Sequence, residues 1–328
     1  MSNRILYADI GGTFARFAFA PPGVRPHVSS VLSTQMLPGL GEAVSEAMRA
    51  EGITAPLAGV AIAGAGPVID GAINLTNAGW RIDASIIASA TGVQHPLIVN
   101  DFTAQAAALA ALAPDDLDSF GGGAGDPYAP RAVVGPGTGF GVSALVPAGG
   151  GRFVPLAAEG GHVDLAPGNP RELAIIWQLQ QQFGHVSCER VLSGSGLETL
   201  YGAIAALDGV AVAPRPTPAE IATRARAKTD PVAVETIHVF TGLMGAAAGN
   251  VVLTIGATGG LYLAGGILPR WGDLFDRALF RHRMEAKGRM GAWLSRVPTH
   301  LVTAPDAAMI GLAELFCGMR VLLADHTP

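Results

Sequence analysis

Three short glycine-rich segments have the composition of phosphate-binding turns. Glycines in a turn let backbone N–H groups approach phosphate oxygens closely. Asp9 could also hold Mg²⁺ through water, Thr13 could donate to a phosphate, and the small residues of the third segment could admit an adenine or a ribose. Each segment alone equally suits a glycine hairpin with a capping Asp, or close helix–strand packing. The segments are Ala8, Asp9, Ile10, Gly11, Gly12 and Thr13; Gly135, Pro136, Gly137, Thr138 and Gly139; and Leu263, Ala264, Gly265 and Gly266.

Asn100 and Asp101 follow one predicted strand and begin a predicted helix. A carboxylate at the carboxyl end of a strand points into the crevice where α/β proteins bind ligands. The helix N-terminus favours its ionised form. That suits phosphoryl transfer, in which the base mainly orients the acceptor hydroxyl. The same position suits an N-cap pair, because Asn and Asp are both good caps. The sequence leaves both interpretations open.

Glu159, His162 and Glu189 add polar groups outside the glycine turns. The glycines between Glu159 and His162 predict a loop that can aim both side chains at one small ligand. Neutral polyols are recognised by several such acceptors and donors, which a wrong sugar would leave unpaired. A single Glu or His is more often structural or solvated. Cys188 beside Glu189 has no adjacent base or second cysteine to support redox chemistry.

The elements that must position these residues follow from the hydrophobic pattern of the first half. Strands are predicted at 4–10, 13–20, 57–63 and 97–99, with a strand pair at 69–75 around Asp70-Gly71. Helical spacing predicts helices at 41–51, at 83–90 with Asp83 as N-cap, and at 102–112. The Gly- and Pro-rich stretch 119–130 predicts an exposed loop.

The second half begins by repeating the opening of the chain. A strand at 132–134, a glycine turn and a return strand at 141–146 match the strand, turn and strand of residues 6–20. Two copies imply a duplicated fold with one copy per domain. Helices are predicted at 171–183, 196–206, 218–227 and 231–255, a strand at 261–264 and a closing helix at 306–323. Mixed strands and helices favour an α/β fold.

Composition narrows the function classes. The 328 residues suggest two domains. The net charge of −5 and the absence of a basic run give no reason to expect a nucleic-acid partner. The only lysines, Lys228 and Lys287, lie outside any G-x-x-x-x-G-K pattern, so there is no P-loop lysine. Two cysteines are too few for a disulfide framework or a four-cysteine zinc site, which suits a reducing cytoplasm.

No membrane segment is expected either. The uncharged stretch 242–268 is broken by glycines and predicts a buried helix, a glycine turn and a buried strand. The N-terminus lacks the charged and apolar regions of a secretory signal.

In combination, these motifs resemble the bacterial glucokinase family of the sugar-kinase/Hsp70/actin superfamily. They run in family order and, with the closing helix, cover nearly the whole chain. The matching stretches are Ala8-Asp-Ile-Gly-Gly-Thr13, Thr76-Asn77 with Trp80, Ile98-Val-Asn-Asp-Phe-Thr-Ala104, 134–141, Glu159-Gly-Gly-His-Val-Asp164, Glu189-Arg-Val-Leu-Ser-Gly194 and Ala264-Gly-Gly-Ile267.

The resemblance implies two actin-like ATPase (ribonuclease H-like) α/β domains with a cleft between them. The small domain would be residues 1–111 completed by the C-terminal helix 304–328, and the large domain residues 112–303. It implies transfer of a phosphoryl group from ATP, with Mg²⁺ on the phosphates near Asp9 and no dedicated protein metal site, to the 6-hydroxyl of glucose. A cytoplasmic homodimer acting at the entry to glycolysis is also implied.

Site roles follow from the same resemblance. Asp101 would be the catalytic base, and Asn100, Asp101, Glu159, His162 and Glu189 would hold the sugar. Residues Ala8 to Thr13, Gly137, Thr138, Gly265 and Gly266 would line the ATP site. One departure is Phe14, where the family often has Asn.

Three alternatives to a glucose kinase that uses ATP remain at this point. They are a kinase for another hexose, a kinase that uses polyphosphate, and a sugar-binding regulator that is not an enzyme. The zinc-binding repressor and kinase group requires a cysteine cluster, which Cys188 and Cys317 cannot form.

Overall fold

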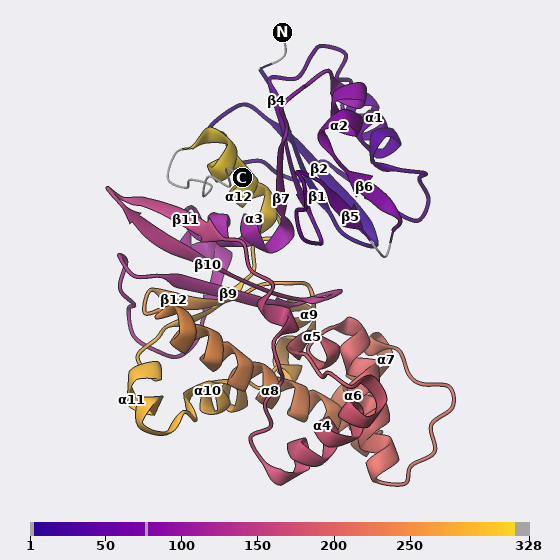
Figure 1. The fold of residues 1–328 in the computed structure, drawn as a ribbon, viewed down its shortest axis with the longest axis vertical. Coiled ribbons are helices and arrows are strands. Elements are labelled where there is room, and N and C mark those ends of the chain that lie inside the picture. The colour runs from indigo at the N-terminus through magenta and orange to yellow at the C-terminus, as the bar shows by residue number, and fades with distance from the viewer. Residues whose placement is uncertain (1–2, 76–77, 319–328) are drawn as a thin grey trace. The chain divides into compact units, whose positions relative to one another are not determined.

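The computed structural model describes residues 3–75 and 78–318, and the chain forms two compact units (Figure 1). The first comprises Met1–Asp116, Ser143–Ala158 and Ala304–Pro328, and the second Leu117–Val142 and Glu159–Thr303. The α/β class predicted from the sequence is confirmed. The sequence placed 143–158 in the larger domain, whereas here these residues go with the first unit. The domain boundaries themselves stay a prediction.

A five-stranded sheet forms the centre of the first unit, in the order β3-β2-β1-β4-β7. The first two strands form the predicted hairpin, and β1, β4 and β7 run parallel. The register pairs Ile10 with Gly64 and Gly64 with Asn100. The turn after β1 and the helix after β7 therefore start from the same edge of the sheet. The strands are β1 Ile5–Ile10, β2 Phe14–Ala20, β3 Ser30–Ser33, β4 Gly59–Gly64 and β7 Leu97–Asn100.

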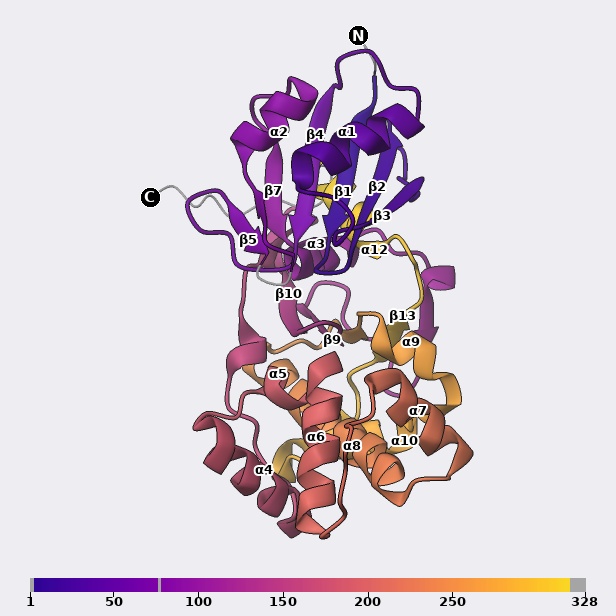
Figure 2. The same ribbon diagram turned by 90° about the vertical axis from the view of Figure 1, so that its right-hand side faces the viewer.

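Two pairs of helices complete this unit. Helices α1 (Leu40–Ala50) and α2 (Ala84–Thr91) lie side by side over one face of the sheet (Figure 2). Helix α3 (Asp101–Ala108) packs against α12 (Ala307–Cys317). The predicted extension of α3 to residue 112 is wrong, because the chain tightens into i→i+3 turns after Ala108. Leu109 N–H donates to Ala106 C=O, and Ala110 N–H donates to Ala107 C=O. The predicted end of the closing helix, at residue 323, lies outside the described residues.

The predicted strand pair around Asp70-Gly71 is also misplaced. Only an isolated bridge joins Ile69 to Ala72 there. The paired strands are β5 (Ile73–Leu75) and β6 (Trp80–Ile82), which form their own two-stranded sheet. Both are three residues long, too short to show an alternating pattern in the sequence. Thr76 and Asn77, part of the family resemblance, lie outside the described residues.

The second sheet has the order β11-β10-β9-β12-β13-β8. Strands β9, β12 and β13 run parallel, and β8 is antiparallel to β13. The order β3-β2-β1-β4-β7 of the first sheet therefore recurs as β11-β10-β9-β12-β13, which confirms that the strand arrangement is duplicated. The predicted assignment of one copy to each domain does not match the two units, because β11 and most of β10 belong to the first unit. The strands are β8 Leu117–Ser119, β9 Arg131–Pro136, β10 Phe140–Gly149, β11 Arg152–Leu156, β12 Gly260–Leu263 and β13 Thr299–Val302.

Helices account for most of the second unit. The predicted boundaries of α7 and α8 match the structure. Helix α10 and the short helices α5, α9 and α11 were not predicted. The helices are α4 Pro170–Phe183, α5 Cys188–Val191, α6 Gly194–Leu207, α7 Pro218–Ala227, α8 Pro231–Ile255, α9 Ile267–Trp271, α10 Arg277–Glu285 and α11 Gly291–Leu294. Short 3₁₀ turns lie at Gly160–His162, Gly272–Leu274 and Gly288–Met290 of this unit, and at Pro114–Asp116 of the first unit.

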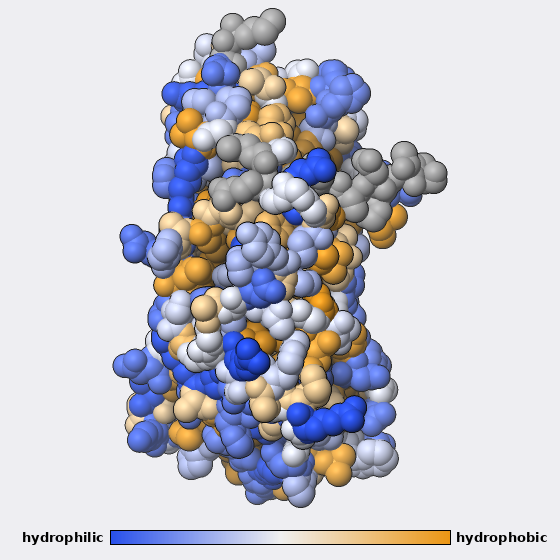
Figure 3. Space-filling model, turned by 90° about the vertical axis from the view of Figure 1, so that its left-hand side faces the viewer, coloured by the Kyte–Doolittle hydropathy of each residue, from blue (hydrophilic) through white to orange (hydrophobic). Residues whose placement is uncertain are grey.

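Helix α8 is the core helix of this unit. By length and composition it could cross a membrane, but 72% of its apolar window is buried inside the protein. Phe240, Leu243 and Met244 belong to the hydrophobic core. A turn and buried β12 follow it, as the sequence predicts. On the surface seen in Figure 3, apolar and polar side chains are intermixed.

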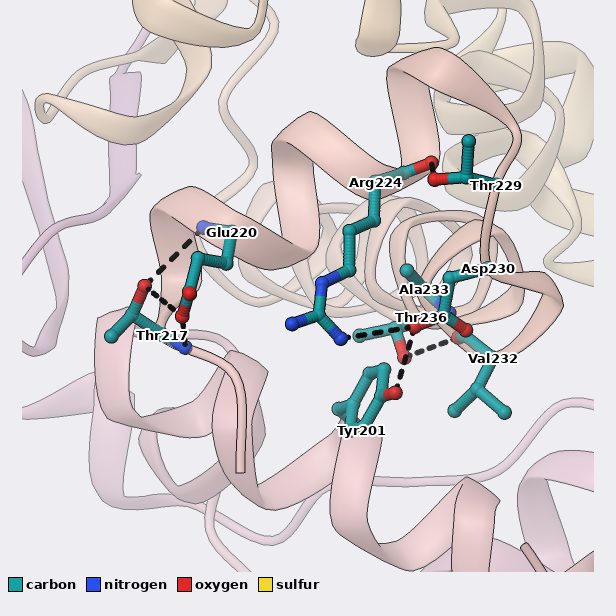
Figure 4. Close-up of polar contacts among 9 residues, drawn as sticks. All are labelled: Tyr201, Thr217, Glu220, Arg224, Thr229, Asp230, Val232, Ala233 and Thr236. Atoms are coloured by element: carbon teal, nitrogen blue, oxygen red, sulfur yellow. Dashed lines mark hydrogen bonds and ion pairs between the residues drawn. The ribbon is translucent and has the colours of Figure 1, made fainter. Parts of the chain in front are cut away.

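The starts of α7 and α8 show why these helices begin where they do (Figure 4). Thr217 and Glu220 form a reciprocal capping box at α7. At α8, Asp230 accepts from Ala233 N–H at 3.1 Å and from the Tyr201 hydroxyl at 2.8 Å. Burial has the largest single effect on the pKa of Asp230 and raises it. The hydrogen bonds to Asp230 and the Arg224 guanidinium, 3.6 Å away, together outweigh burial and hold that pKa below its usual value. Proline at the first helical position reinforces both starts.

Candidate active site

The first glycine turn is a hairpin held by the strand beside it. Gly11 N–H donates to Phe14 C=O at 2.9 Å and closes the turn. Thr34 fixes the turn from the side, because its hydroxyl donates to Gly12 C=O at 2.9 Å and its N–H donates to Thr13 C=O at 3.0 Å. The side chain of Thr13 is exposed. The backbone of the turn is thus held in place, and the exposed Thr13 carries a hydroxyl of the kind that can donate to a phosphate.

Asp9 lies one residue before the end of β1 with a largely buried carboxylate. Burial raises its pKa, and Arg16, its cross-strand neighbour, opposes that shift. The guanidinium is 3.5 Å from Asp9 Oδ2, a loose monodentate pair. A carboxylate oxygen beside a phosphate turn is a ligand type that Mg²⁺ accepts, directly or through water. Asp9 therefore fits a metal-bound nucleotide.

Asn100 and Asp101 lie at the junction of β7 and α3, as predicted. Asn100 is the N-cap: its Oδ1 accepts from Phe102 N–H at 2.8 Å and Thr103 N–H at 3.2 Å. Its Nδ2 donates to Gly66 C=O at 3.1 Å. Asp101 is the first residue of the helix and is partly exposed, with Oδ1 2.9 Å from Phe102 N–H. The capping function therefore lies mainly with Asn100.

Glu159 and His162 lie on one tight loop of the second unit. The loop closes through His162 N–H, which donates to Glu159 C=O at 3.0 Å. Glu159 Oε2 and His162 Nε2 are 3.9 Å apart, and both side chains are exposed. Gly161 packs against the Phe140 carbonyl so closely that a Cβ would overlap it. The glycines aim both side chains together, as the sequence predicts.

Glu189 lies on α5, whose start is capped by Ser187. Its Oε2 accepts a hydrogen bond from Phe140 N–H at 3.0 Å. A Cβ at Gly139 would overlap the Glu189 carboxylate and force that side chain to move. Sequence reasoning missed this contact, and the glycine at 139 was its only sequence signal.

The second and third glycine segments lie against each other. Ala264 N–H donates to Val134 C=O at 2.9 Å. A Cβ at Gly135 would overlap Ala264 C=O, and Gly265, with φ +85°, packs against Pro136. The second turn is closed by Gly137 N–H on Gly139 C=O at 2.8 Å. The structure thus brings together the two segments that the sequence could only list separately.

The chemistry of each unit can now be stated. The first carries the glycine turn after β1, Asp9 and Asp101 along one sheet edge. The second carries two adjoining glycine segments with Glu159, His162 and Glu189. Among residues 3–75 and 78–318, no group of three or more His, Cys, Asp or Glu side chains could hold a metal ion. The donors present suit a polyol and a polyphosphate.

Comparison with known proteins decides the family. The family model described as Glucokinase matches residues 6–318. The glucokinase of Paramagnetospirillum magneticum is 45% identical over 318 residues, which cover 96% of this chain and 98% of that protein. The glucokinase of Chromobacterium violaceum is 43% identical over 98% of this chain and 89% of its own length. The chain belongs to the glucokinase family. It is an enzyme, and its reaction is the ATP-dependent phosphorylation of glucose.

Solved structures also match this chain to a glucokinase, and they show that the fold by itself does not distinguish kinases from regulators. The crystal structure of a glucokinase from an Antarctic psychrotroph has a TM-score of 0.81 at 33% identity, covering 95% of this chain and 98% of that one. A ROK family transcriptional regulator shares the fold at 16% identity, with a TM-score of 0.65 over 94% of this chain. The fold thus accommodates regulators as well as kinases. Sequence identity with the glucokinases assigns this chain to the enzymes.

Proposed function

We propose that Asp101 is the base that accepts the proton of the glucose 6-hydroxyl as the γ-phosphoryl group is transferred from ATP. The observation that carries this proposal is that Asn100 and Asp101 have different surroundings at the start of α3. Asn100 is the N-cap and accepts from Phe102 N–H and Thr103 N–H, while Asp101 Oδ1 shares the Phe102 N–H at 2.9 Å and Asp101 stays partly exposed. The carboxylate lies at the positive end of the helix, which favours its ionised form at neutral pH. The product is glucose 6-phosphate.

Glu159, His162 and Glu189 are proposed to hold the glucose ring, together with Asn100. A carboxylate accepts hydroxyl hydrogen bonds and an imidazole can donate or accept, so these residues match a ring of hydroxyls. Glu159 and His162 already lie 3.9 Å apart on a loop whose glycines allow no larger residue. Each mispaired hydroxyl would leave one of these groups without its partner, which disfavours other hexoses.

The glycine turns are proposed to hold ATP. The first would take the phosphates with the Thr13 hydroxyl and backbone groups of Ala8 to Gly12, and Gly137 and Thr138 would contribute from the second. The segment at Gly265 and Gly266 would accommodate the nucleoside. Asp9 would hold the Mg²⁺ that accompanies the phosphates, and the metal would supply charge neutralisation there. We further propose a cytoplasmic homodimer with no dedicated metal site of its own.

Replacing Asp101 by Asn tests the base directly. The variant keeps the size of the side chain but removes the proton acceptor. We expect kcat to fall by about 10²- to 10⁴-fold, the usual contribution of general base catalysis. Glucose should still bind, because Asn100, Glu159, His162 and Glu189 remain. Turnover, glucose binding by calorimetry and the melting temperature are measured together.

Asp83→Asn is the matched control for that variant. Asp83 caps α2 in the first unit through Ile86 N–H and lies outside the proposed site. Its replacement should leave kcat unchanged. Near-wild-type turnover in Asp101→Asn would assign Asp101 to the helix start alone and move the search for the base to Glu159 or Glu189.

A further inference from the structure

The backbone of Phe140 is in contact with two segments of the proposed sugar site, through the N–H of the peptide before it and the carbonyl of the peptide after it. Its N–H donates to Glu189 Oε2 at 3.0 Å. The carbonyl of the same residue lies against Gly161, in the loop that carries Glu159 and His162. Phe140 is 4% exposed, so these backbone contacts are sheltered from water.

The peptide that joins Gly139 to Phe140 ends the second glycine turn. Gly139 C=O accepts from Gly137 N–H at 2.8 Å, and Gly137 C=O accepts from Gly194 N–H at 2.9 Å. The position of Phe140 N–H and the shape of the turn at Gly137 and Thr138 are thus set by one short hydrogen-bonded segment. A carboxylate that holds this N–H also holds the turn.

We propose that Glu189 is a positioning residue for the nucleotide turn as well as a sugar ligand, and so couples glucose binding to nucleotide binding. This inference rests on the proposed function of both segments. Oε2 is committed to Phe140 N–H, while Oε1 can accept a sugar hydroxyl. A bound sugar fixes the carboxylate, and the fixed carboxylate holds the turn in the form that receives the phosphates. By linkage, nucleotide binding favours glucose binding by the same factor.

Two glycines are explained by this arrangement. Gly139 and Gly161 have no left-handed backbone requirement, because no positive φ occurs at either residue. At Gly161 a Cβ would overlap the Phe140 carbonyl, which is backbone, and at Gly139 a Cβ would overlap Glu189 Oε2, so that the carboxylate would have to move off Phe140 N–H. A hydrogen bond to a charged acceptor is among the stronger ones in proteins, so displacing it should be measurable.

The test measures nucleotide binding with no sugar present. Isothermal titration with ADP and Mg²⁺ is carried out on the wild-type protein, Glu189→Ala, Glu189→Gln and His162→Ala. Glu189→Ala should weaken ADP binding by about fivefold or more, within the usual range of coupling between sites. Glu189→Gln should restore ADP binding, because its amide oxygen still accepts from Phe140 N–H. His162→Ala removes a proposed sugar ligand with no contact to the turn and should leave ADP binding unchanged.

The reverse measurement uses glucose with no nucleotide present. Gly139→Ala should weaken glucose binding, although residue 139 is not a proposed sugar ligand, because its Cβ displaces the Glu189 carboxylate. Gly41→Ala is the matched control. The nearest atom to its Cβ is on Ile86 of α2, at the ordinary contact distance of 3.7 Å, so the added methyl group displaces nothing. Melting temperatures confirm that each variant is folded.

The outcomes separate the two proposals. If His162→Ala and Glu189→Ala weaken glucose binding but ADP binding is unchanged in Glu189→Ala, the coupling is wrong and the sugar site stands. If Glu189→Ala leaves glucose binding unchanged, the assignment of Glu189 as a sugar ligand is wrong. Loss of ADP binding in His162→Ala as well would show a general disturbance of the unit and would also overturn the coupling.

Discussion

Asn100 and Asp101 have side chains of the same length on consecutive residues, yet the structure gives them different surroundings. Asn100 uses both ends of its amide, on two helix N–H groups and on Gly66 C=O. Asp101 lies one position further, where its carboxylate is partly exposed. The sequence could predict the junction but not this division, because the choice of cap depends on a backbone carbonyl 34 residues away.

Other site residues differ in how far the sequence could place them. The hairpin at Gly11 and the loop at Gly160 were predictable, because glycine spacing and flanking strands are local signals. The contact between Glu189 and Phe140 N–H was not, because it joins residues 49 positions apart. The pairing of Arg16 with Asp9 across β1 and β2 was missed. Predicting it requires the register of the two strands, and the spacing of the glycine turn did not fix that register.

Asp83 gives a pH prediction at the residue scale. The Ile86 N–H, followed by Ser85 and Arg81, lowers the pKa of this N-cap carboxyl to about 2. Its unfolded value is about 3.9, so the ionised cap stabilises the fold above about pH 4 and this stabilisation is lost as pH falls towards 2. Asp83→Asn keeps a cap but has no charge to titrate. We expect wild type to exceed the variant in unfolding free energy at pH 6, with the difference shrinking below pH 4. A difference that stays constant across this range would contradict the assignment.

At the scale of elements, close approach explains where helices meet. Gly311 of α12 lies against the backbone of α3. A Cβ added at Gly311 would overlap the Ala104 carbonyl oxygen and would be 2.9 Å from the backbone nitrogen of Ala108. The two helices can pack backbone to backbone only because residue 311 has no side chain. The sequence predicted a closing helix, and the family resemblance assigned it to the small domain, but periodicity does not show which helix it packs against.

Gly311→Ala tests this packing. The added methyl group overlaps a backbone carbonyl that cannot rotate away, so we expect a loss of about 1–3 kcal/mol in unfolding free energy, as for other overpacked cores. Gly41→Ala, in helix α1, places its Cβ in ordinary van der Waals contact with Ile86 and should instead stabilise by up to about 1 kcal/mol through helix propensity. Denaturant unfolding of both variants gives the comparison. Equal effects of the two substitutions would show that the α3–α12 contact is not close.

At the scale of the whole molecule, the sequence and the structure agree on a duplicated architecture. The strand orders β3-β2-β1-β4-β7 and β11-β10-β9-β12-β13 correspond position by position. The sequence could predict this because both copies begin with a buried strand, a glycine turn and a return strand. It could not assign residues 143–158, because a strand's membership of a unit depends on packing that the pattern does not contain.

Dependence on a divalent cation belongs to this scale, since it concerns the complete reaction. The protein has two lysines in all, and neither is placed to neutralise ATP phosphates as a P-loop lysine would. The charge of the phosphates is therefore expected to be neutralised mainly by Mg²⁺. Chelation by EDTA should abolish glucose phosphorylation, and added Mg²⁺ should restore it. Full activity in EDTA would overturn this part of the mechanism.

The substrate panel tests the central claim most directly. ATP and Mg²⁺ are supplied with glucose, fructose, mannose or N-acetylglucosamine, and ADP release is followed for each sugar, with polyphosphate replacing ATP in a parallel series. The polar set Asn100, Glu159, His162 and Glu189 predicts the highest kcat/KM for glucose with ATP as donor. A higher kcat/KM for another sugar, or for polyphosphate, would contradict the account.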